Sequence, residues 1–153
     1  MRNSKNIRRK GFTLVELLIV IVVIGILSAM MMLSSTEATT SAKAAAIVAN
    51  LRNMKTAALA YVADNPSVTD LPDESLIIKY LKDGSATLET GYSFDVGTIP
   101  ANAWYAIYTI QGTTTEISKI QDKLKARASQ VGLCEGLTSA DYNGGTQVSM
   151  FIR

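Results

Sequence analysis

One stretch decides the fold of this chain, and it reads GFTLVELLIVIVVIGILSAMMMLSST over residues 11–36. From Leu17 to Thr36 it carries no charge, and as an α-helix this segment would span about 30 Å, the thickness of the hydrocarbon core of a bilayer. The stretch therefore predicts a membrane-spanning helix. Five of the 15 basic residues lie in the first ten positions, and such clusters stay on the cytoplasmic side. The chain after Thr36 is accordingly expected on the outer side.

The composition excludes several classes of protein. The 153 residues are 48% apolar and only 18% charged, which excludes a disordered chain. With no histidine and a single cysteine, Cys134, the chain cannot build a His-containing triad, a His-rich zinc site, a CxxC redox pair or an internal disulfide. The net charge of +2 belongs to the first ten residues, because the rest carries 10 basic and 13 acidic residues. A general nucleic-acid-binding surface is therefore not indicated.

A secretory signal peptide or a plain membrane anchor would also contain an apolar stretch. The apolar region of a signal peptide is about 7–15 residues long and ends at a small-residue cleavage site, whereas this one reaches Leu33 and continues into helix-forming sequence. A plain anchor leaves Gly11 at the cytoplasmic boundary and Glu16 in the apolar block unexplained. A carboxylate carried to the bilayer centre would cost up to about 3 kcal/mol, which favours a function for Glu16.

The order of residues around Gly11 resembles a known signal. Residues 8–21 read RRKGFTLVELLIVI: a basic segment, Gly, Phe, Thr, two apolar residues, Glu and then an unbroken apolar run. This order resembles the class III signal sequence of type IV pilins and pseudopilins, and the resemblance covers about residues 8–35. It implies that a prepilin peptidase cleaves after Gly11 and N-methylates the new terminal residue, Phe12, so that the apolar helix stays in the mature chain.

Glu16 is the candidate assembly residue. Cleavage would expose an α-amino group at Phe12, which can still carry a positive charge after methylation. In a bundle of staggered helices, the Glu16 carboxylate of one copy can meet the Phe12 amine of its neighbour. Such a pair lowers the cost of burying both charges and sets the axial register. The alternative is an acid that snorkels at the edge of the membrane.

The apolar stretch continues into an amphipathic one. No Pro or Gly occurs between Gly25 and Pro66, and apolar side chains recur at helical spacing. They are Ile47, Leu51, Met54, Ala58 and Tyr61. The pattern predicts one helix from Phe12 to Asp64, half of membrane-spanning character and half amphipathic, that ends before Asn65-Pro66. The stripe is also compatible with a coiled-coil seam, but it is too short and too Ala-rich to specify a zipper.

The rest of the chain predicts a small head that buries the amphipathic half-helix. A capped short helix with acids at its start is expected within residues 70–81, with Gly84 as its stop, and a second helix from a capping box at Thr113 and Glu116 to Gly132. Strands are expected at 92–96, 104–110 and 148–152. In the second strand, Trp104, Ala106, Tyr108 and Ile110 would face one way, and Tyr105, Ile107 and Thr109 the other. The sheet should be mainly antiparallel, although the late strand-helix-strand order leaves room for one parallel pair.

The expected fold class is α+β: a long N-terminal helix, half transmembrane and half amphipathic, packed on a small mainly antiparallel sheet with one or two short helices. This plan resembles the pilin fold. The expected parts are a cleaved basic leader over 1–11, a transmembrane or filament-core helix over 12–36, the amphipathic half of that helix over 37–64 and a globular head over 65–153.

Several residues of the head are weak candidates for ligand chemistry. Asp70, Asp73 and Glu74 could hold Ca²⁺, but acids at a helix start are the simpler interpretation. Residues 141–145 also have a composition typical of calcium sites, but an Asx-type turn accounts for them more simply. Aromatic side chains at Tyr92, Trp104, Tyr105 and Tyr108 could stack on a ligand, but a core and cross-strand pairs are more typical. The basic helix face of Lys119, Lys123, Lys125 and Arg127 could bind DNA phosphate, but a solvated face is more typical. Cys134 is expected to be a buried small hydrophobe.

The sequence thus predicts a structural protein with no catalytic residues, metal or cofactor. The expected function is that of a subunit of a type IV pilus or related filament, with Gly11 and Phe12 as processing residues and Glu16 as the assembly residue. Expected partners are further copies of the chain, a prepilin peptidase and the inner-membrane assembly machinery; nucleic acid stays an open partner. The precursor would lie in the inner membrane with its leader in the cytoplasm, and the mature chain in an extracellular pilus or periplasmic pseudopilus. Alternatives are a pseudopilin of a type II secretion or DNA-uptake system and a membrane-anchored enzyme or receptor.

Overall fold

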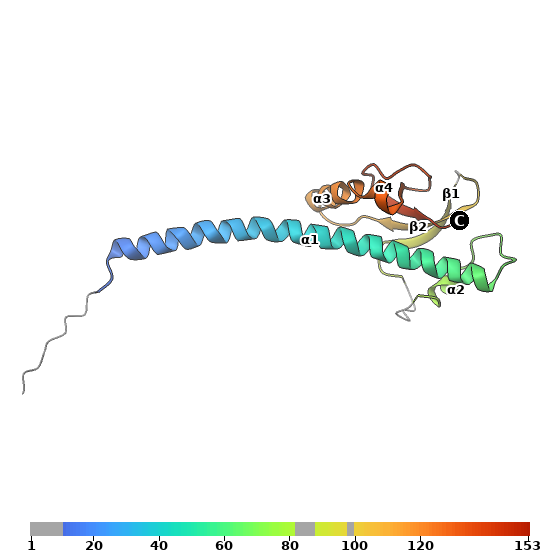
Figure 1. The fold of residues 1–153 in the computed structure, drawn as a ribbon, viewed down its shortest axis with the longest axis horizontal. Coiled ribbons are helices and arrows are strands. Elements are labelled where there is room, and N and C mark those ends of the chain that lie inside the picture. Colours follow the sequence, from blue (N-terminus) through green and yellow to red (C-terminus); the bar gives the residue numbers. More distant parts are fainter. Residues whose placement is uncertain (1–10, 82–87, 98–99) are drawn as a thin grey trace, which may run out of the picture. The chain divides into compact units, whose positions relative to one another are not determined.

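The computed structural model describes residues 11–81, 88–97 and 100–153. The basic cluster expected as a leader and the predicted stop at Gly84 lie outside these residues. The elements are α1 (Leu14–Asp64), α2 (Glu74–Ile78), β1 (Tyr92–Gly97), β2 (Ala103–Thr109), α3 (Thr114–Lys125), α4 (Ala128–Val131), β3 (Leu133–Glu135) and β4 (Gln147–Phe151) (Figure 1). The chain divides into two compact units, one ending at Ala38 and the other formed by Thr39–Arg153.

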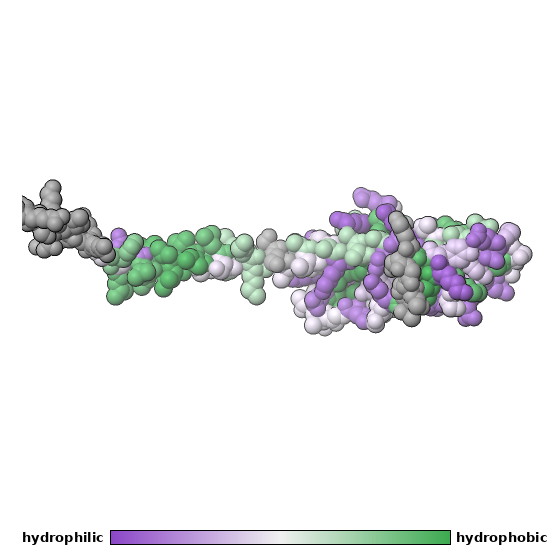
Figure 2. Space-filling view, turned by 90° about the horizontal axis from the view of Figure 1, so that it is seen from below, coloured by the Kyte–Doolittle hydropathy of each residue, from purple (hydrophilic) through white to green (hydrophobic). Residues whose placement is uncertain are grey.

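The first unit consists of the apolar part of α1. The helix is continuous through Gly25, and every large apolar side chain from Phe12 to Met32 is exposed. Figure 2 shows this segment as an almost unbroken apolar surface. In length and composition α1 is the one helix in the described part of the chain that is able to cross a membrane.

The second unit contains a four-stranded sheet in the order β1-β2-β4-β3. All three pairings are antiparallel, as expected for most of the sheet, with Tyr92 opposite Tyr108 in β1 and β2, and Tyr105 opposite Phe151 in β2 and β4. The parallel pair left open by the sequence does not occur among the described strands. The sequence pattern does not predict the short strand β3. This strand pairs with β4, which is therefore antiparallel to both of its neighbours, β2 and β3.

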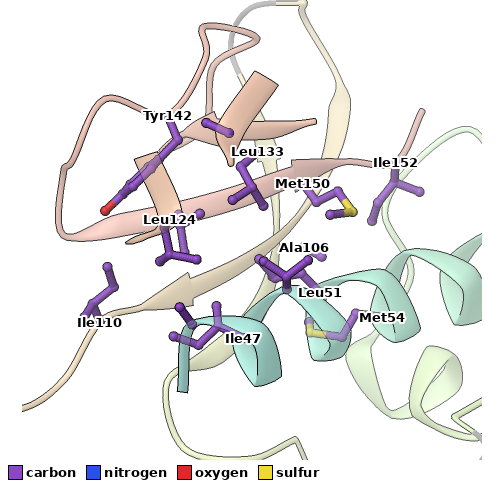
Figure 3. Close-up of a cluster of buried hydrophobic side chains, with 14 of the residues drawn as sticks. Ile47, Leu51, Met54, Ala106, Ile110, Leu124, Leu133, Tyr142, Met150 and Ile152 are labelled. Atoms are coloured by element: carbon purple, nitrogen blue, oxygen red, sulfur yellow. The ribbon is translucent and has the colours of Figure 1, made fainter. Parts of the chain in front are cut away.

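The amphipathic half of α1 supplies one wall of the core. Ile47, Leu51, Met54 and Ala58 are buried and Tyr61 is half-buried, so the predicted stripe is confirmed. Figure 3 shows Ile47, Leu51 and Met54 on the helix beside Ala106 of β2, with Met150 of β4 in the same cluster. The head is therefore an α+β unit in which the long helix is part of the hydrophobic core.

The helix predicted from the capping box to Gly132 is interrupted. It ends as α3 at Lys125 and resumes as α4 at Ala128. Between them Arg127 has φ −113° and ψ −4°, and its N–H donates to the Leu124 carbonyl, three residues back and not four. Leu124 and Ala128 still lie in one core, so the apolar stripe is right although the helix is not continuous. Gly132 ends α4 with φ 74°, the left-handed conformation that favours glycine at a helix end.

The two faces of β2 contribute to two separate apolar clusters. Trp104, Ala106 and Ile110 belong to the core that contains α1, whereas Tyr105 and Ile107 pack on the other face. The predicted alternation is thus confirmed. Gly97 leaves room for the Tyr105 ring on this second face, since a Cβ at position 97 would overlap the ring.

Cys134 lies in the second cluster as a free, buried thiol, as predicted, and burial raises its pKa. Alkylation needs an accessible thiolate. At pH 8 we therefore expect the folded protein to react with iodoacetamide at least about 100-fold more slowly than the unfolded chain, because the thiol must first be exposed by opening of the structure. Intact mass against time measures the rate, and the same protein in guanidinium chloride is the control. Equal rates in the two states would show that the thiol is exposed.

Candidate functional site

The candidate site lies at the start of α1. Gly11, Phe12 and Thr13 are exposed and precede the helix, so α1 begins two residues later than predicted. The first helical hydrogen bond runs from the Leu17 N–H to the Thr13 carbonyl at 3.3 Å, which makes Thr13 the N-cap residue.

Thr13 and Glu16 form a capping box. Glu16 Oε2 accepts hydrogen bonds from the Thr13 backbone N–H and from the Thr13 hydroxyl, both at 2.8 Å. In return the Glu16 N–H donates to Thr13 Oγ1 at 3.2 Å. The two residues thereby satisfy polar groups that a helix start leaves unpaired. The structure thus gives Glu16 a partner within its own chain.

A second box of the same spacing occurs at α3 and was predicted. Glu116 Oε2 accepts from the Thr113 hydroxyl at 3.0 Å and from its N–H at 3.3 Å, and Glu116 Oε1 lies 3.5 Å from Lys43 Nζ of α1. The Thr113 backbone N–H, more than the hydroxyl or the lysine, lowers the pKa of Glu116. The box at Thr13 and Glu16 was missed, although its Thr-x-x-Glu pattern is the same signal.

Gly11 has no structural reason within the described chain to be glycine. A Cβ built on it meets no atom within 4 Å, and its φ lies outside the left-handed region. Gly97 is the contrasting case, because packing against Tyr105 requires its lack of a side chain. A requirement for glycine at position 11 would therefore come from a molecule that binds the chain there.

The comparison with protein families matches this same region. Residues 6–32 match the model of the prokaryotic N-terminal methylation motif. The chain carries a class III signal sequence. This signal is the one that type IV pilins and pseudopilins present to the prepilin peptidase, so the resemblance read from the sequence is confirmed. The signal and the apolar helix together fit a membrane-anchored precursor.

The methylation motif covers only the first part of the chain. Comparisons with curated proteins and with solved structures found no match. The α+β architecture of the head is consistent with the pilin fold.

The acidic candidates of the head do not converge on one point. Within the described ranges, no group of three or more His, Cys, Asp or Glu side chains is arranged to hold a metal ion. Glu74 opens α2, and Asp73 occupies its N-cap position without a side-chain cap. The loop over residues 141–145 is instead organised by a carboxylate that the sequence did not single out, since Glu135 Oε2 accepts from the backbone N–H of Asn143 at 2.9 Å and of Gly145 at 3.4 Å.

The aromatic candidates are parts of the core and of a cross-strand pair, which was the favoured interpretation. Trp104 and Tyr105 are fully buried. Tyr92 and Tyr108 are paired across β1 and β2 with ring centroids 4.4 Å apart. The Tyr92 hydroxyl accepts a hydrogen bond from Asn50 of α1 at 3.1 Å, and burial raises the pKa of Tyr92 to about 12. Tyr92, Trp104 and Tyr108 thus pack the sheet against the helix, whereas Tyr105 packs on its other face.

The basic candidates lie on or just after α3. Lys119, Lys125 and Arg127 are exposed, and Lys123 is half-buried. A solvated face stays the prediction for these residues.

Proposed function

We propose that this chain is a structural subunit of a type IV pilus or a related filament, which polymerises through its N-terminal helix after cleavage by a prepilin peptidase. One observation carries the proposal: over residues 14–32 the methylation motif overlaps a helical segment whose large apolar side chains are all exposed. A soluble monomer rarely exposes a continuous apolar surface of this kind.

The apolar segment of α1 would be covered both in the membrane-bound precursor and in the filament. Each large aliphatic side chain that leaves water contributes about 1.5–3 kcal/mol. In the precursor the lipid acyl chains of the inner membrane cover these side chains, and in a filament the same side chains are covered by other copies. The inner-membrane machinery moves the subunit from the first state to the second, and an extracellular pilus or periplasmic pseudopilus is its destination.

Three residues carry processing and assembly in this proposal. The peptidase cleaves after Gly11 and methylates Phe12. The described chain itself does not require glycine at position 11, which supports a peptidase subsite that takes no side chain. Glu16 pairs with the Phe12 amine of a neighbouring copy. Both bonds from Thr13 end on Oε2 of Glu16, which supports a role for Oε1 toward that amine.

The processing step is tested by the intact mass of the protein purified from membranes. We expect a mature chain that starts at methylated Phe12, whereas the variant Gly11→Leu keeps its leader, because the added side chain would have to enter the peptidase subsite. Gly25→Ala is the matched control: its Cβ also meets no atom, and it lies within the helix away from the cleaved bond. A mature chain that starts within residues 29–36 would identify an ordinary signal peptide and contradict the proposal.

The composition of fibres sheared from the cell surface distinguishes a pilin from a pseudopilin. Fibres composed mainly of this chain identify a pilin, and a correctly processed chain that is nearly absent from them identifies a pseudopilin, which shares the methylation motif. An uncleaved, monomeric chain in the membrane would reject the filament in favour of an anchored enzyme or receptor.

A further inference from the structure

The cleaved bond of the proposed processing step lies just outside α1. The helix begins at Leu14, while Gly11, Phe12 and Thr13 are non-helical and the Phe12 side chain is 87% exposed. Proteolysis occurs preferentially where the backbone is exposed and not engaged in secondary structure. The position of the helix start therefore decides whether the Gly11–Phe12 bond is available.

The helix start is set by the Thr13–Glu16 capping box. The Thr13 hydroxyl accepts the Glu16 N–H, and the Thr13 N–H is held by the Glu16 carboxylate, so Thr13 is fixed as the last residue before the helix. Without this cap, the nearest residue upstream that is accepted at an N-cap is Gly11, since glycine ranks close to threonine there. A helix capped at Gly11 would take Phe12 as its first helical residue and would draw the Gly11–Phe12 bond into its first turn.

We propose that Thr13 is a positioning residue for leader cleavage, and that its capping box with Glu16 holds the helix boundary downstream of the Gly11–Phe12 bond. The inference rests on the proposed function, because it concerns the same cleavage. Hydrolysis adds the hydroxyl of water to the Gly11 carbonyl carbon and a proton to the Phe12 nitrogen as the peptide bond breaks. Thr13 takes no part in these bonds; it keeps the peptide unit that undergoes them out of the helix.

Substitutions at the two residues separate the capping box from the charge of Glu16. Thr13→Val keeps the shape of a β-branched side chain but removes the hydroxyl, whereas Thr13→Ser retains it. Glu16→Gln removes the charge but retains the box, because glutamine serves at this position of a capping box as glutamate does. The box therefore predicts slow cleavage for Thr13→Val alone.

The experiment follows cleavage of the full-length precursor by a prepilin peptidase in detergent micelles. A helix cap shifts the boundary equilibrium by about fivefold, which is about 1 kcal/mol. For Thr13→Val we expect KM to rise by up to about fivefold with kcat unchanged, because only the non-helical fraction of the precursor binds. Thr13→Ser and Glu16→Gln should stay within about twofold of the wild type.

The Cα chemical shifts of Gly11 and Phe12 in the labelled precursor give a readout that does not depend on the peptidase. They should move toward helical values in Thr13→Val and return in Thr13→Ser. A rise in KM without this movement would mean that the peptidase contacts the Thr13 hydroxyl directly, and unchanged cleavage of Thr13→Val would mean that the box does not control access; either result overturns the inference and leaves the proposed function standing. A wild-type precursor that is not cleaved at Gly11–Phe12 rejects the proposed function itself.

Discussion

A chain that starts at Glu37 should be a folded, soluble monomer, whereas a chain that starts at Asn65 should not fold. The shorter chain lacks Ile47, Leu51 and Met54, which are buried against the sheet. Truncation of a single buried Leu, Ile or Met costs about 2–5 kcal/mol, and a whole domain is stable by only about 5–15 kcal/mol. Loss of the helix therefore exceeds what the head can tolerate.

Size-exclusion chromatography and thermal unfolding followed by circular dichroism measure both chains. In the longer chain, Leu51→Ala should lower the free energy of unfolding by about 2–5 kcal/mol, while its exposed neighbour Arg52→Ala should change it by less than about 0.5 kcal/mol. A well-folded monomer that starts at Asn65 would show that the helix is not part of the core.

Replacement of Glu16 by Gln should abolish filament assembly while leaving membrane insertion and leader cleavage intact. If the Glu16 carboxylate pairs with the Phe12 amine of a neighbour, the variant leaves that amine unpaired in an apolar bundle, and a broken buried ion pair costs about 3–5 kcal/mol. The helix start should not change, because glutamine retains the capping box with Thr13. When the variant is co-expressed with the wild type, the fibre yield should fall below that of the wild type alone, since each variant subunit leaves the Phe12 amine of a neighbouring subunit unpaired.

The yield of sheared fibres, normalised to the amount of processed subunit in the membrane, is the measurement. An acid that only snorkels at the membrane edge predicts the opposite result, because its removal makes the segment more apolar. Normal fibres from correctly processed Glu16→Gln protein would therefore reject the pairing.

The long helix was predictable because its signals are local. The apolar positions from Ile47 to Ala58 recur at helical spacing, and Asn65-Pro66 ends α1 at Asp64, as predicted. Strand β3 was not predictable in the same way, since Leu133–Glu135 is too short to show an alternation. It exists because it pairs with β4, which is a contact between distant parts of the chain.

The methylation motif was predictable from the sequence, and the capping box inside it carried a local signal as well. The order of Gly11, Phe12 and Glu16 predicted the signal, whereas the hydrogen bond between Thr13 and Glu16 was not predicted. The Thr-x-x-Glu spacing was sufficient to find that bond. The role of Glu135 was beyond sequence reasoning, because its backbone partners lie eight and ten residues away in a loop that only the folded chain closes.

The two halves of α1 belong to different units, which limits where recombination could join the N-terminal segment of one such protein to the head of another. The methylation motif ends at residue 32, and the first helix residue in the core of the head is Ala44. Recombination within residues 33–43 would join one methylation motif to another head, with each head keeping the half-helix that its sheet packs against. A crossover after Ala44 would pair a sheet with a foreign helix face and disrupt its packing. Heads can therefore diversify in sequence while the methylation motif stays constant, provided that the inherited unit begins inside the helix and not at its end.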